Sequence, residues 1–322
     1  MKEVISSLLQ RAKTEELKGQ FLLDEPLSGH TSYRIGGPAD LYVAVWKEED
    51  LLGWIRLARE LEVPHFVMGR GTNLLVADEG IRGVVIENRC RGVLIEGEVW
   101  RVLAGGSFPA LARRTAQEGL AGLEWGTGIP GSVGGAIVNN AGAHGSSVAQ
   151  VLQSVTILDQ KGDVRKMPVE QIRLNYRPSR FRQKRQEVVL SAKFALRPES
   201  PALLKERLTS YTKQRGETQP QEPSAGSVFK NPEGDHAGRL IEEVGLKGRR
   251  VGDAQISPRH ANFIVNLGGA KASDVAALIK LVRERVWQTY GVELELEIEL
   301  VGKWEAEELA TLTQKPSGKA IA

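Results

Sequence analysis

The sequence predicts an α+β protein with more than one domain. Its 322 residues are more than a single hydrophobic core usually organises. Segments with strand and helix periodicity alternate along the chain, and no internal repeat is visible. The segment RPESP at 197–201 places two prolines and charged side chains directly after an apolar strand, so we expect a domain boundary there.

The part before this boundary combines strands with amphipathic helices. After an N-terminal helix, the apolar spacing predicts further helices from about Glu49 to Leu61 and from about Phe108 to Glu118. The segment VTILDQKGDVRKM predicts a hairpin that turns at Lys161 and Gly162. Other strands are expected at 41–46, 65–69, 83–87, 92–105 and 187–197.

The part after the boundary is expected to be a second α+β domain. Helices are predicted from about Ala202 to Arg215 and from Ser273 to Tyr290, with a strand at 262–267 between them. The segment VELELEIELV at 292–301 alternates strictly between apolar and acidic residues, which predicts a final strand. Residues after 303 are expected to form a frayed or loosely docked tail.

Composition limits the classes of function. The 43 basic and 40 acidic residues nearly balance, so no surface for binding nucleic acid is indicated. A single cysteine excludes an internal disulfide, and five scattered histidines predict no metal site. Apolar runs are shorter than a membrane span and the N-terminus is unlike a signal peptide. We therefore expect a soluble, cytoplasmic protein. A monomer is expected, although no sequence pattern fixes the oligomeric state.

Two glycine-rich segments carry the strongest functional signal. They are GRGTNLL at 69–75, directly after a predicted strand, and GIPGSVGGAIVNNAGAHG at 128–145. Glycines in such positions let backbone N–H groups converge on a phosphate, with Arg70 and Asn73 as additional donors. A lone G-x-G is more often only a tight connection, and the Rossmann fingerprint is absent. Two such segments in one region suggest an elongated ligand with phosphates at one segment and a flat ring at the other.

Six segments in the same order resemble the UDP-N-acetylenolpyruvoylglucosamine reductase family, the flavoenzymes of the second step of bacterial peptidoglycan precursor synthesis. They are GRGTNLLV, GLEWGTGIPGSVGGAIVNNAGAHG, NYRPSRF, GSVFKNP, HANFIVN and ELEIELVG. The resemblance runs from about Thr31 to Gly302. It implies a two-subdomain FAD-binding fold of the vanillyl-alcohol-oxidase type, followed by a C-terminal α+β substrate domain. The implied divisions are 1–83 for the N-terminal helix and first FAD-binding subdomain, 84–199 for the second, 200–302 for the substrate domain and 303–322 for the tail.

The resemblance also implies the ligands. FAD is expected as a non-covalent cofactor, NADPH as co-substrate, and UDP-N-acetylglucosamine enolpyruvate as the substrate that is reduced to UDP-N-acetylmuramate. Gly131, Ser132, Gly134 and Gly135 would leave bare backbone on which the flavin ring can lie. The implied cofactor-binding residues are Gly69, Arg70, Gly71, Thr72, Asn73, Gly131, Ser132, Gly134, Gly135, Asn140 and Ala141.

Hydride delivery to an enolpyruvyl ether leaves negative charge on the neighbouring carbon and its carboxylate. Arg177 matches the family's arginine for this carboxylate, a task suited to a planar guanidinium. Composition alone would not separate Arg177 from Arg180, Arg182, Lys184 and Arg185, which usually only face water.

Ser227 matches the family's proton donor, and its weak acidity is acceptable because the carbanion-like carbon is a strong base. A serine after glycine is otherwise most often a turn residue. Lys230 is expected to help electrostatically, and Asn231 to contact the substrate.

Glu297 matches the family's acid, which would act on the substrate carboxylate together with Arg177. Four glutamates on one strand face usually face solvent, so full exposure of Glu297 would count against this role. Arg215 is a candidate for the substrate diphosphate, although a cation at a helix end is favourable in any case. Gln219 is a weaker candidate, and His260 either borders the site or is structural.

The spacing of 50 positions between Arg177 and Ser227 leaves little room for the tyrosine-bearing loop of one family branch. We assign the chain to the shorter branch. Two other functions stay open on the residues alone. A covalent-flavin oxidase would need an attachment residue such as His65, although no histidine lies inside the loop. A nucleotide-binding protein without activity would have no reason to combine Arg177, Ser227 and Glu297.

Overall fold

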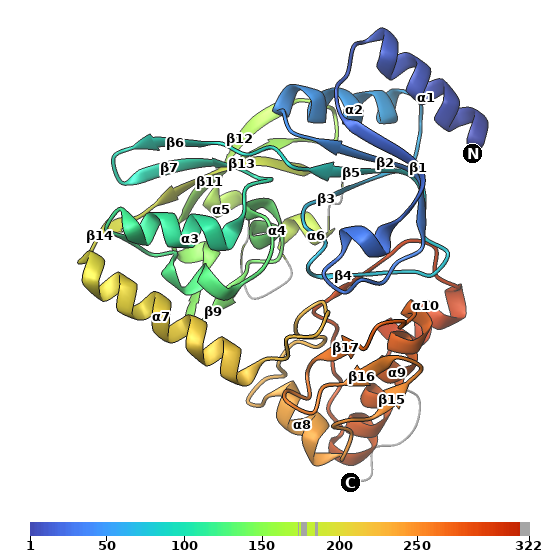
Figure 1. Ribbon diagram of the computed structural model, residues 1–322, viewed down its shortest axis with the longest axis vertical. Coiled ribbons are helices and arrows are strands. Elements are labelled where there is room, and N and C mark those ends of the chain that lie inside the picture. Colours follow the sequence, from blue (N-terminus) through green and yellow to red (C-terminus); the bar gives the residue numbers. More distant parts are fainter. Residues whose placement is uncertain (173, 175–178, 184–185, 316–322) are drawn as a thin grey trace. The chain divides into compact units, whose positions relative to one another are not determined.

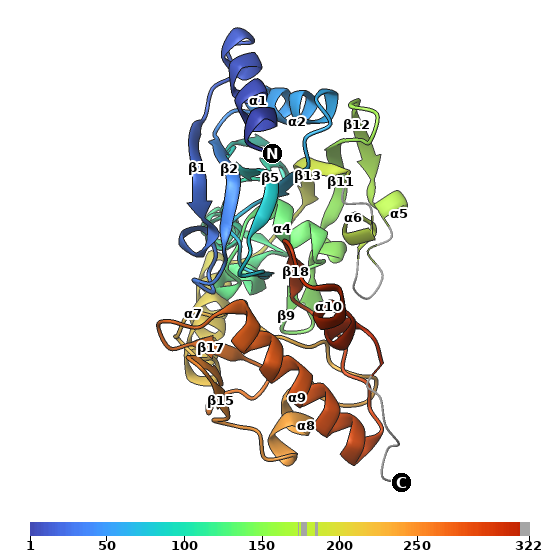
Figure 2. The ribbon, with the colours of Figure 1, turned by 90° about the vertical axis from the view of Figure 1, so that its right-hand side faces the viewer.

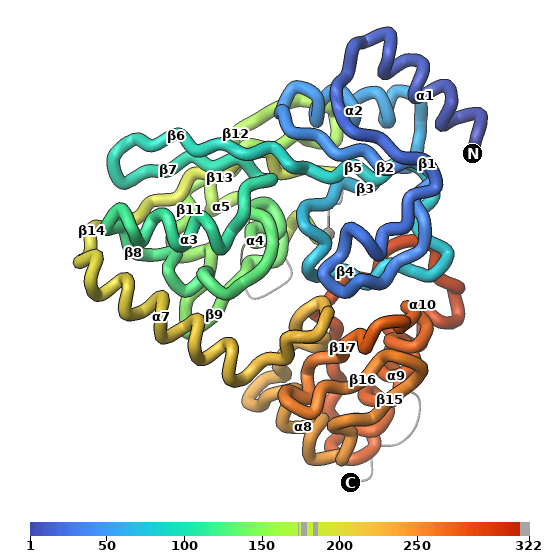
Figure 3. The backbone as a smooth tube through the Cα atoms, viewed as in Figure 1, coloured from blue at the N-terminus to red at the C-terminus, as the bar shows by residue number. Residues whose placement is uncertain are grey.

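The structure is a computed structural model that describes residues 1–172, 174, 179–183 and 186–315 (Figure 1). The chain forms two compact units, and the tube in Figure 3 lets the reader follow it through both. The first unit comprises 1–22, 41–70 and 83–217, and the second comprises 23–40, 71–82 and 218–322. Each unit is therefore assembled from segments that are distant in sequence.

One sheet has the strand order β1-β2-β5-β3, and β3 and β5 run parallel. Two helices of the first unit, α1 and α2, lie side by side (Figure 2). Leu8 of α1 and Trp54 of α2 are buried in one core with Val43 and Val84 of this sheet. The bounds are α1 Lys2–Thr14, β1 Gln20–Pro26, β2 Pro38–Val45, α2 Glu48–Glu60, β3 His65–Met68 and β5 Ile81–Asn88.

The rest of the first unit is built on a five-stranded antiparallel sheet of order β12-β11-β13-β7-β6. Phe108 of α3 and Val133 of α4 are buried in a core with Trp100 and Phe194 of the sheet. The strands are β6 Val93–Glu96, β7 Val99–Leu103, β11 Leu152–Leu158, β12 Val164–Pro168 and β13 Val188–Ala195. The other elements are α3 Phe108–Gln117, β8 Leu120–Ala121, η2 Glu124–Gly128, α4 Val133–Val138, β9 Gly142–Ala143, β10 Ser146–Ser147, η3 Val148–Gln150, α5 Val169–Ile172, α6 Arg180–Gln183, β14 Arg197–Pro198 and α7 Pro201–Thr218.

The second unit packs the long helix α9 against a three-stranded antiparallel sheet, β15-β16-β17. Leu278 and Ile279 of α9 are buried with Ile256 and Ile264 of the sheet. A separate parallel pair joins β4 to β18. The bounds are η1 Leu27–His30, β4 Leu74–Val76, α8 Ala237–Glu243, β15 Arg250–Val251, β16 Ala254–Ile256, β17 Ile264–Asn266, α9 Ala272–Tyr290, β18 Glu299–Val301 and α10 Ala306–Thr313.

The predicted helices correspond to α1, α2, α3, α7 and α9, and the predicted hairpin is β11–β12. The prediction of a regular strand over 292–301 was wrong. Only β18 is a strand, and Leu296 takes part in an isolated bridge with Phe229. The carbonyl of Val228 accepts from the N–H groups of both Glu297 and Ile298, at 2.8 and 3.5 Å, which departs from a regular ladder.

Of the two alternatives expected for the tail, frayed or loosely docked, the first was wrong for 306–313, which form α10 with a buried Leu312. Arg283 on α9 explains this docking. Its guanidinium is buried and donates to the carbonyls of Leu294, at 3.0 Å, and of Thr311, at 2.9 Å. One side chain thus joins α9, the segment before β18 and α10.

Replacing Arg283 by methionine should lower the free energy of unfolding by about 2 to 4 kcal/mol, because two carbonyls lose a charged donor in a buried place. Equilibrium urea unfolding measures this change. Arg285→Met is the matched control, since Arg285 is exposed on the same helix and should cost less than about 0.5 kcal/mol. Equal losses in both variants would refute the role given to Arg283.

Candidate active site

The glycine-rich segment after β3 is divided between the two units. Gly69 and Arg70 belong to the first, and Gly71, Thr72 and Asn73 to the second. Gly71 has φ of +59°, in the left-handed region that favours glycine. A Cβ on Gly69 would lie 2.2 Å from the hydroxyl oxygen of Ser132, so these two predicted residues pack closely in the first unit. Arg70 is exposed.

The glycine-rich segment at 128–145 forms the short helix α4. Ser132 caps it by accepting a hydrogen bond from the N–H of Gly135 at 3.1 Å. A Cβ on Gly134 would lie 3.0 Å from the Cβ of Ala104, so a larger residue would be tight at this position. A Cβ on Gly135 would approach Ser132 Oγ alone, at 3.3 Å. Gly135 is therefore the less crowded of the two glycines.

The end of α4 holds neighbouring segments in place. The side chain of Asn140 donates to the carbonyl of Leu174 at 3.1 Å and accepts from the N–H of Ala149 at 3.3 Å. The hydroxyl of Ser179 donates to the carbonyl of Val138. Ala141 is buried. Arg177 lies outside the described residues, but Leu174 and Ser179, on either side of 175–178, are both fastened to the end of α4.

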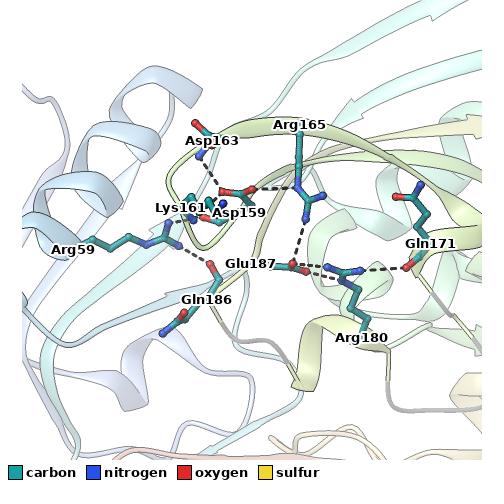
Figure 4. A network of polar contacts seen from close by, with 9 residues as sticks. All are labelled: Arg59, Asp159, Lys161, Asp163, Arg165, Gln171, Arg180, Gln186 and Glu187. Carbon is teal, nitrogen blue, oxygen red and sulfur yellow. Dashed lines mark hydrogen bonds and ion pairs between the residues drawn. The ribbon is translucent and has the colours of Figure 1, made fainter.

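Arg180, one of the cations that compete with Arg177 in the sequence, is committed to an ion pair (Figure 4). Its guanidinium donates to both carboxylate oxygens of Glu187, at 2.8 and 2.6 Å, and Glu187 is buried. This pairing raises the pKa of Arg180. Arg165 lies 3.2 Å from Asp159 and 3.5 Å from Glu187, which extends the network to the β11–β12 hairpin.

Arg59 connects α2 to this network by donating to two backbone carbonyls, those of Asp159, at 2.7 Å, and Gln186, at 2.5 Å. The network thus joins α2, the hairpin, β13 and α6 within the first unit. The Glu187 carboxylate largely neutralises the charge of Arg180.

Arg215 lies near the end of α7, where a cluster of three side chains forms in the first unit. A Cβ on Gly128 would lie 2.6 Å from Cδ of Arg215, so the side-chain stem packs on this glycine. The ring of His144 stacks on Tyr211, one turn earlier on α7, with centroids 4.0 Å apart. Burial, and secondly the charge of Arg215, hold the pKa of His144 below its ordinary value. Sequence reasoning missed His144, although it lies within the glycine-rich segment.

In the second unit, Ser227 and Glu297 are joined through one residue. Val228 follows Ser227, and its carbonyl accepts the N–H of Glu297 at 2.8 Å. The side chain of Asn73 donates to the carbonyl of Glu297 at 3.2 Å. Glu297 is half-buried, whereas Glu293 and Glu295 are exposed. Ser227, Glu297 and Asn73, predicted from three distant segments, therefore belong to one hydrogen-bonded framework.

Lys230 and Asn231 continue the Ser227 segment. The ammonium of Lys230 lies 2.7 Å from the carboxylate of Glu295, which is largely exposed. The side chain of Asn231 accepts the N–H of Ala237 at the start of α8, at 3.1 Å. Gln219 is held through its carbonyl, which accepts from Arg259 at 3.2 Å.

A cavity of about 380 Å³ opens beside Ser227 within the second unit. Its lining combines neutral polar groups with three cationic side chains, of which Arg239 is paired with Asp235 and Lys247 with Glu242. Polar groups and cations of this kind can bind an anionic ligand with hydroxyl groups. The lining residues are Ser227, Asn231, His236, Gly238, Arg239, Glu242, Lys247, Arg259, His260, Ala261 and Asn262. Sequence reasoning missed Arg239, Lys247 and Arg259, because charged residues spread over separate elements carry no local pattern.

Comparisons with known proteins identify the family. Residues 39–168 match the FAD binding domain family, and residues 219–301 match the C-terminal domain of UDP-N-acetylenolpyruvoylglucosamine reductase. The UDP-N-acetylenolpyruvoylglucosamine reductase of Rubrobacter xylanophilus is 48% identical over 87% of this chain and 95% of its own length. The chain belongs to the UDP-N-acetylenolpyruvoylglucosamine reductase family.

Other members of the reductase family give the same result. UDP-N-acetylenolpyruvoylglucosamine reductase 2 of Symbiobacterium thermophilum is 46% identical over 88% of this chain and 93% of its own length. The crystal structure of the Thermus caldophilus reductase matches with a TM-score of 0.76 and 37% identity, over 88% of this chain and 98% of that one. The predicted fold class and the assignment to FAD-dependent oxidoreductases are thereby confirmed.

The described part of the chain contains neither a cluster of metal-binding side chains nor a membrane-spanning helix. No group of histidine, cysteine, aspartate and glutamate in it is arranged to hold a metal ion. Among its helices, none combines the length and apolar character needed to cross a membrane.

Arg215→Gln should raise the pKa of His144 towards its ordinary value, because the nearby positive charge is removed while burial remains. The pH dependence of the His144 ring signals in NMR spectra measures this. Lys213→Gln, an exposed change on the same helix, should leave the pKa unchanged. The pKa of His144 is lower in the folded than in the unfolded protein, so the free energy of unfolding should decrease as the pH falls below about 6.5. This decrease should be smaller in Arg215→Gln. An unchanged pKa of His144 in Arg215→Gln would contradict the influence of the Arg215 charge on His144.

Proposed function

We propose that this chain reduces UDP-N-acetylglucosamine enolpyruvate to UDP-N-acetylmuramate, with FAD as a non-covalent cofactor and NADPH as the source of hydride. The reaction belongs to peptidoglycan precursor synthesis in the cytoplasm, and the active form is a monomer of the shorter family branch. Family membership supports the reaction, and the framework that joins Ser227 to Glu297 is the observation that carries the assignment to this site.

The residues of the glycine-rich segments fit FAD. Gly71 has a backbone conformation that residues with a side chain rarely adopt. The neighbouring threonine and asparagine supply neutral donors suited to a diphosphate. We assign Gly69, Arg70, Gly71, Thr72 and Asn73 to that part of the cofactor. The flavin ring is assigned to Gly131, Ser132, Gly134 and Gly135, with Asn140 and Ala141 supporting this wall. When bound, FAD supplies the hydride at N5.

The chain's own groups complete the reduction. Arg177 binds the enolpyruvyl carboxylate and withdraws the charge that develops there, and Glu297 orients the same group. The Ser227 hydroxyl gives its proton to the carbon that carries the negative charge. The negative charge that develops on the enolpyruvyl group thus meets the cation of Arg177, and the Ser227 hydroxyl supplies the proton that neutralises it.

The cavity beside Ser227 supports the choice of a sugar nucleotide as substrate. Arg215, Lys230 and Asn231 are assigned to substrate binding, and a diphosphate is an anion of the kind that cationic side chains such as Arg259 in the cavity lining bind. Lys230 can exchange its exposed partner Glu295 for a phosphate, since a surface ion pair of this kind contributes little stability.

An anaerobic titration tests the proposed reaction as a whole. The purified protein loaded with FAD should lose its yellow absorbance on addition of NADPH and regain it with UDP-N-acetylglucosamine enolpyruvate. Initial rates should follow ping-pong kinetics. A protein that does not take up FAD, or a reduced flavin that enolpyruvyl substrate does not reoxidise, would refute the proposal.

Ser227→Ala should leave flavin reduction by NADPH nearly unchanged and slow reoxidation by substrate by about 100- to 10,000-fold, because the proton donor is lost. Stopped-flow absorbance of each half-reaction measures the two rates separately.

Ser224→Ala is the matched control. It lies in the same segment, and its carbonyl rather than its hydroxyl accepts the hydrogen bond from Ser32. Similar losses in both half-reactions of Ser227→Ala, or equal effects of the two variants, would remove the proton-donor role.

A further inference from the structure

Asn262 is a buried side chain whose polar atoms are both bonded to the residue two positions after Ser227. Its amide nitrogen donates to the carbonyl of Phe229 at 2.8 Å, and its amide oxygen accepts the N–H of Phe229 at 2.9 Å. Its own carbonyl accepts the N–H of Val228 at 2.8 Å. Asn262 is 4% exposed, so water cannot easily replace these bonds.

These bonds fix the Ser227 segment on one side, and Glu297 fixes it on the other. The amide of Asn262 meets the backbone of Phe229 as a neighbouring strand would, with one donor and one acceptor. The carbonyl of Val228 is bound to the N–H of Glu297. The Phe229 ring is buried in the core. The backbone that follows Ser227 is therefore hydrogen-bonded to Asn262 and to Glu297, and the buried Phe229 ring packs in the core.

His260 in turn binds the backbone of Asn262. Its Nδ1 accepts the N–H of Asn262 at 3.2 Å, which places the proton of the neutral ring on Nε2. Burial lowers the pKa of His260 and so favours this neutral form. Both His260 and Asn262 line the cavity beside Ser227. Of the two roles considered for His260 from the sequence, the structural one is supported by its hydrogen bond to Asn262.

Proton transfer from a serine depends strongly on such placement. As the Ser227 O–H bond breaks, a C–H bond forms at the negatively charged carbon, and the serine oxygen regains a proton from water. The hydroxyl is a weak acid, so the transfer is fast only if oxygen and carbon are held in line. A displacement of about 1 Å can cost about 100-fold in rate.

We propose that Asn262 is a positioning residue for proton transfer by Ser227, acting through its paired hydrogen bonds to Phe229. This inference rests on the proposed function and adds a residue to it. Asn262 acts on the serine segment and is given no contact with the reacting atoms.

Asn262→Leu tests the proposal, since leucine has the same branched shape as asparagine, although it is larger, and lacks both hydrogen bonds. With FAD bound, flavin reduction by NADPH should stay within about 2-fold of wild type. Reoxidation at saturating enolpyruvyl substrate should slow by about 10- to 100-fold, with the loss in kcat rather than KM. The slowing in D₂O relative to H₂O should also increase, because proton transfer becomes more limiting. Asn262→Asp keeps the acceptor for the N–H of Phe229 and should be affected less.

Asn266→Leu is the matched control. Asn266 is similarly buried four residues later, at the end of β17, and it bonds to the carbonyl of Tyr33 and the N–H groups of Gly268 and Ala270. It should lose stability without a selective loss of reoxidation.

Normal reoxidation in Asn262→Leu, or equal slowing in Asn266→Leu, would overturn the proposal. If the leucine variants do not bind FAD, the same comparison between Asn262→Asp and Asn266→Asp decides it. Failure of the wild-type protein to reoxidise would instead refute the proposed function.

Discussion

The hydrogen bond from the N–H of Glu297 to the carbonyl of Val228 is the contact on which the second unit's part of the site depends. It fastens the segment before β18 to the segment that carries Ser227, 70 residues earlier in the chain. Asn73 holds the carbonyl of the same glutamate, and Asn262 holds the other edge of the serine segment. Two candidate groups for catalysis are thus placed by main-chain bonds rather than by flexible side chains.

Buried polar side chains maintain this arrangement. Asn262 and Arg283 are each nearly inaccessible and each donate to main-chain carbonyls that regular strands would have satisfied. Arg283 holds Leu294, three residues before Glu297, and also α10. In the first unit, the pair of Arg180 with Glu187 and the amide of Asn140 hold described residues next to 175–178 in a similar way.

Periodicity predicted the helices well, because α2, α3 and α9 bury one continuous apolar face. It failed over 292–298, where alternation is present but the contacts are a single bridge, the N–H groups bound to Val228 and the guanidinium of Arg283. Family motifs selected Ser227 and Glu297, which the structure links. They did not find Asn262, His144 or the cationic wall of the cavity, because these depend on contacts between distant segments. Gly134 stays a predicted cofactor residue, and its close approach to Ala104 is a second reason for a glycine at this position.

A crystal structure of the protein with bound UDP-N-acetylglucosamine enolpyruvate would test the central claim most directly. The account predicts that the Ser227 hydroxyl and the Glu297 carboxylate both lie within hydrogen-bond distance of the enolpyruvyl group, with the Val228 to Glu297 bond intact. An enolpyruvyl group bound away from either side chain, or a broken bond between these two segments, would contradict it.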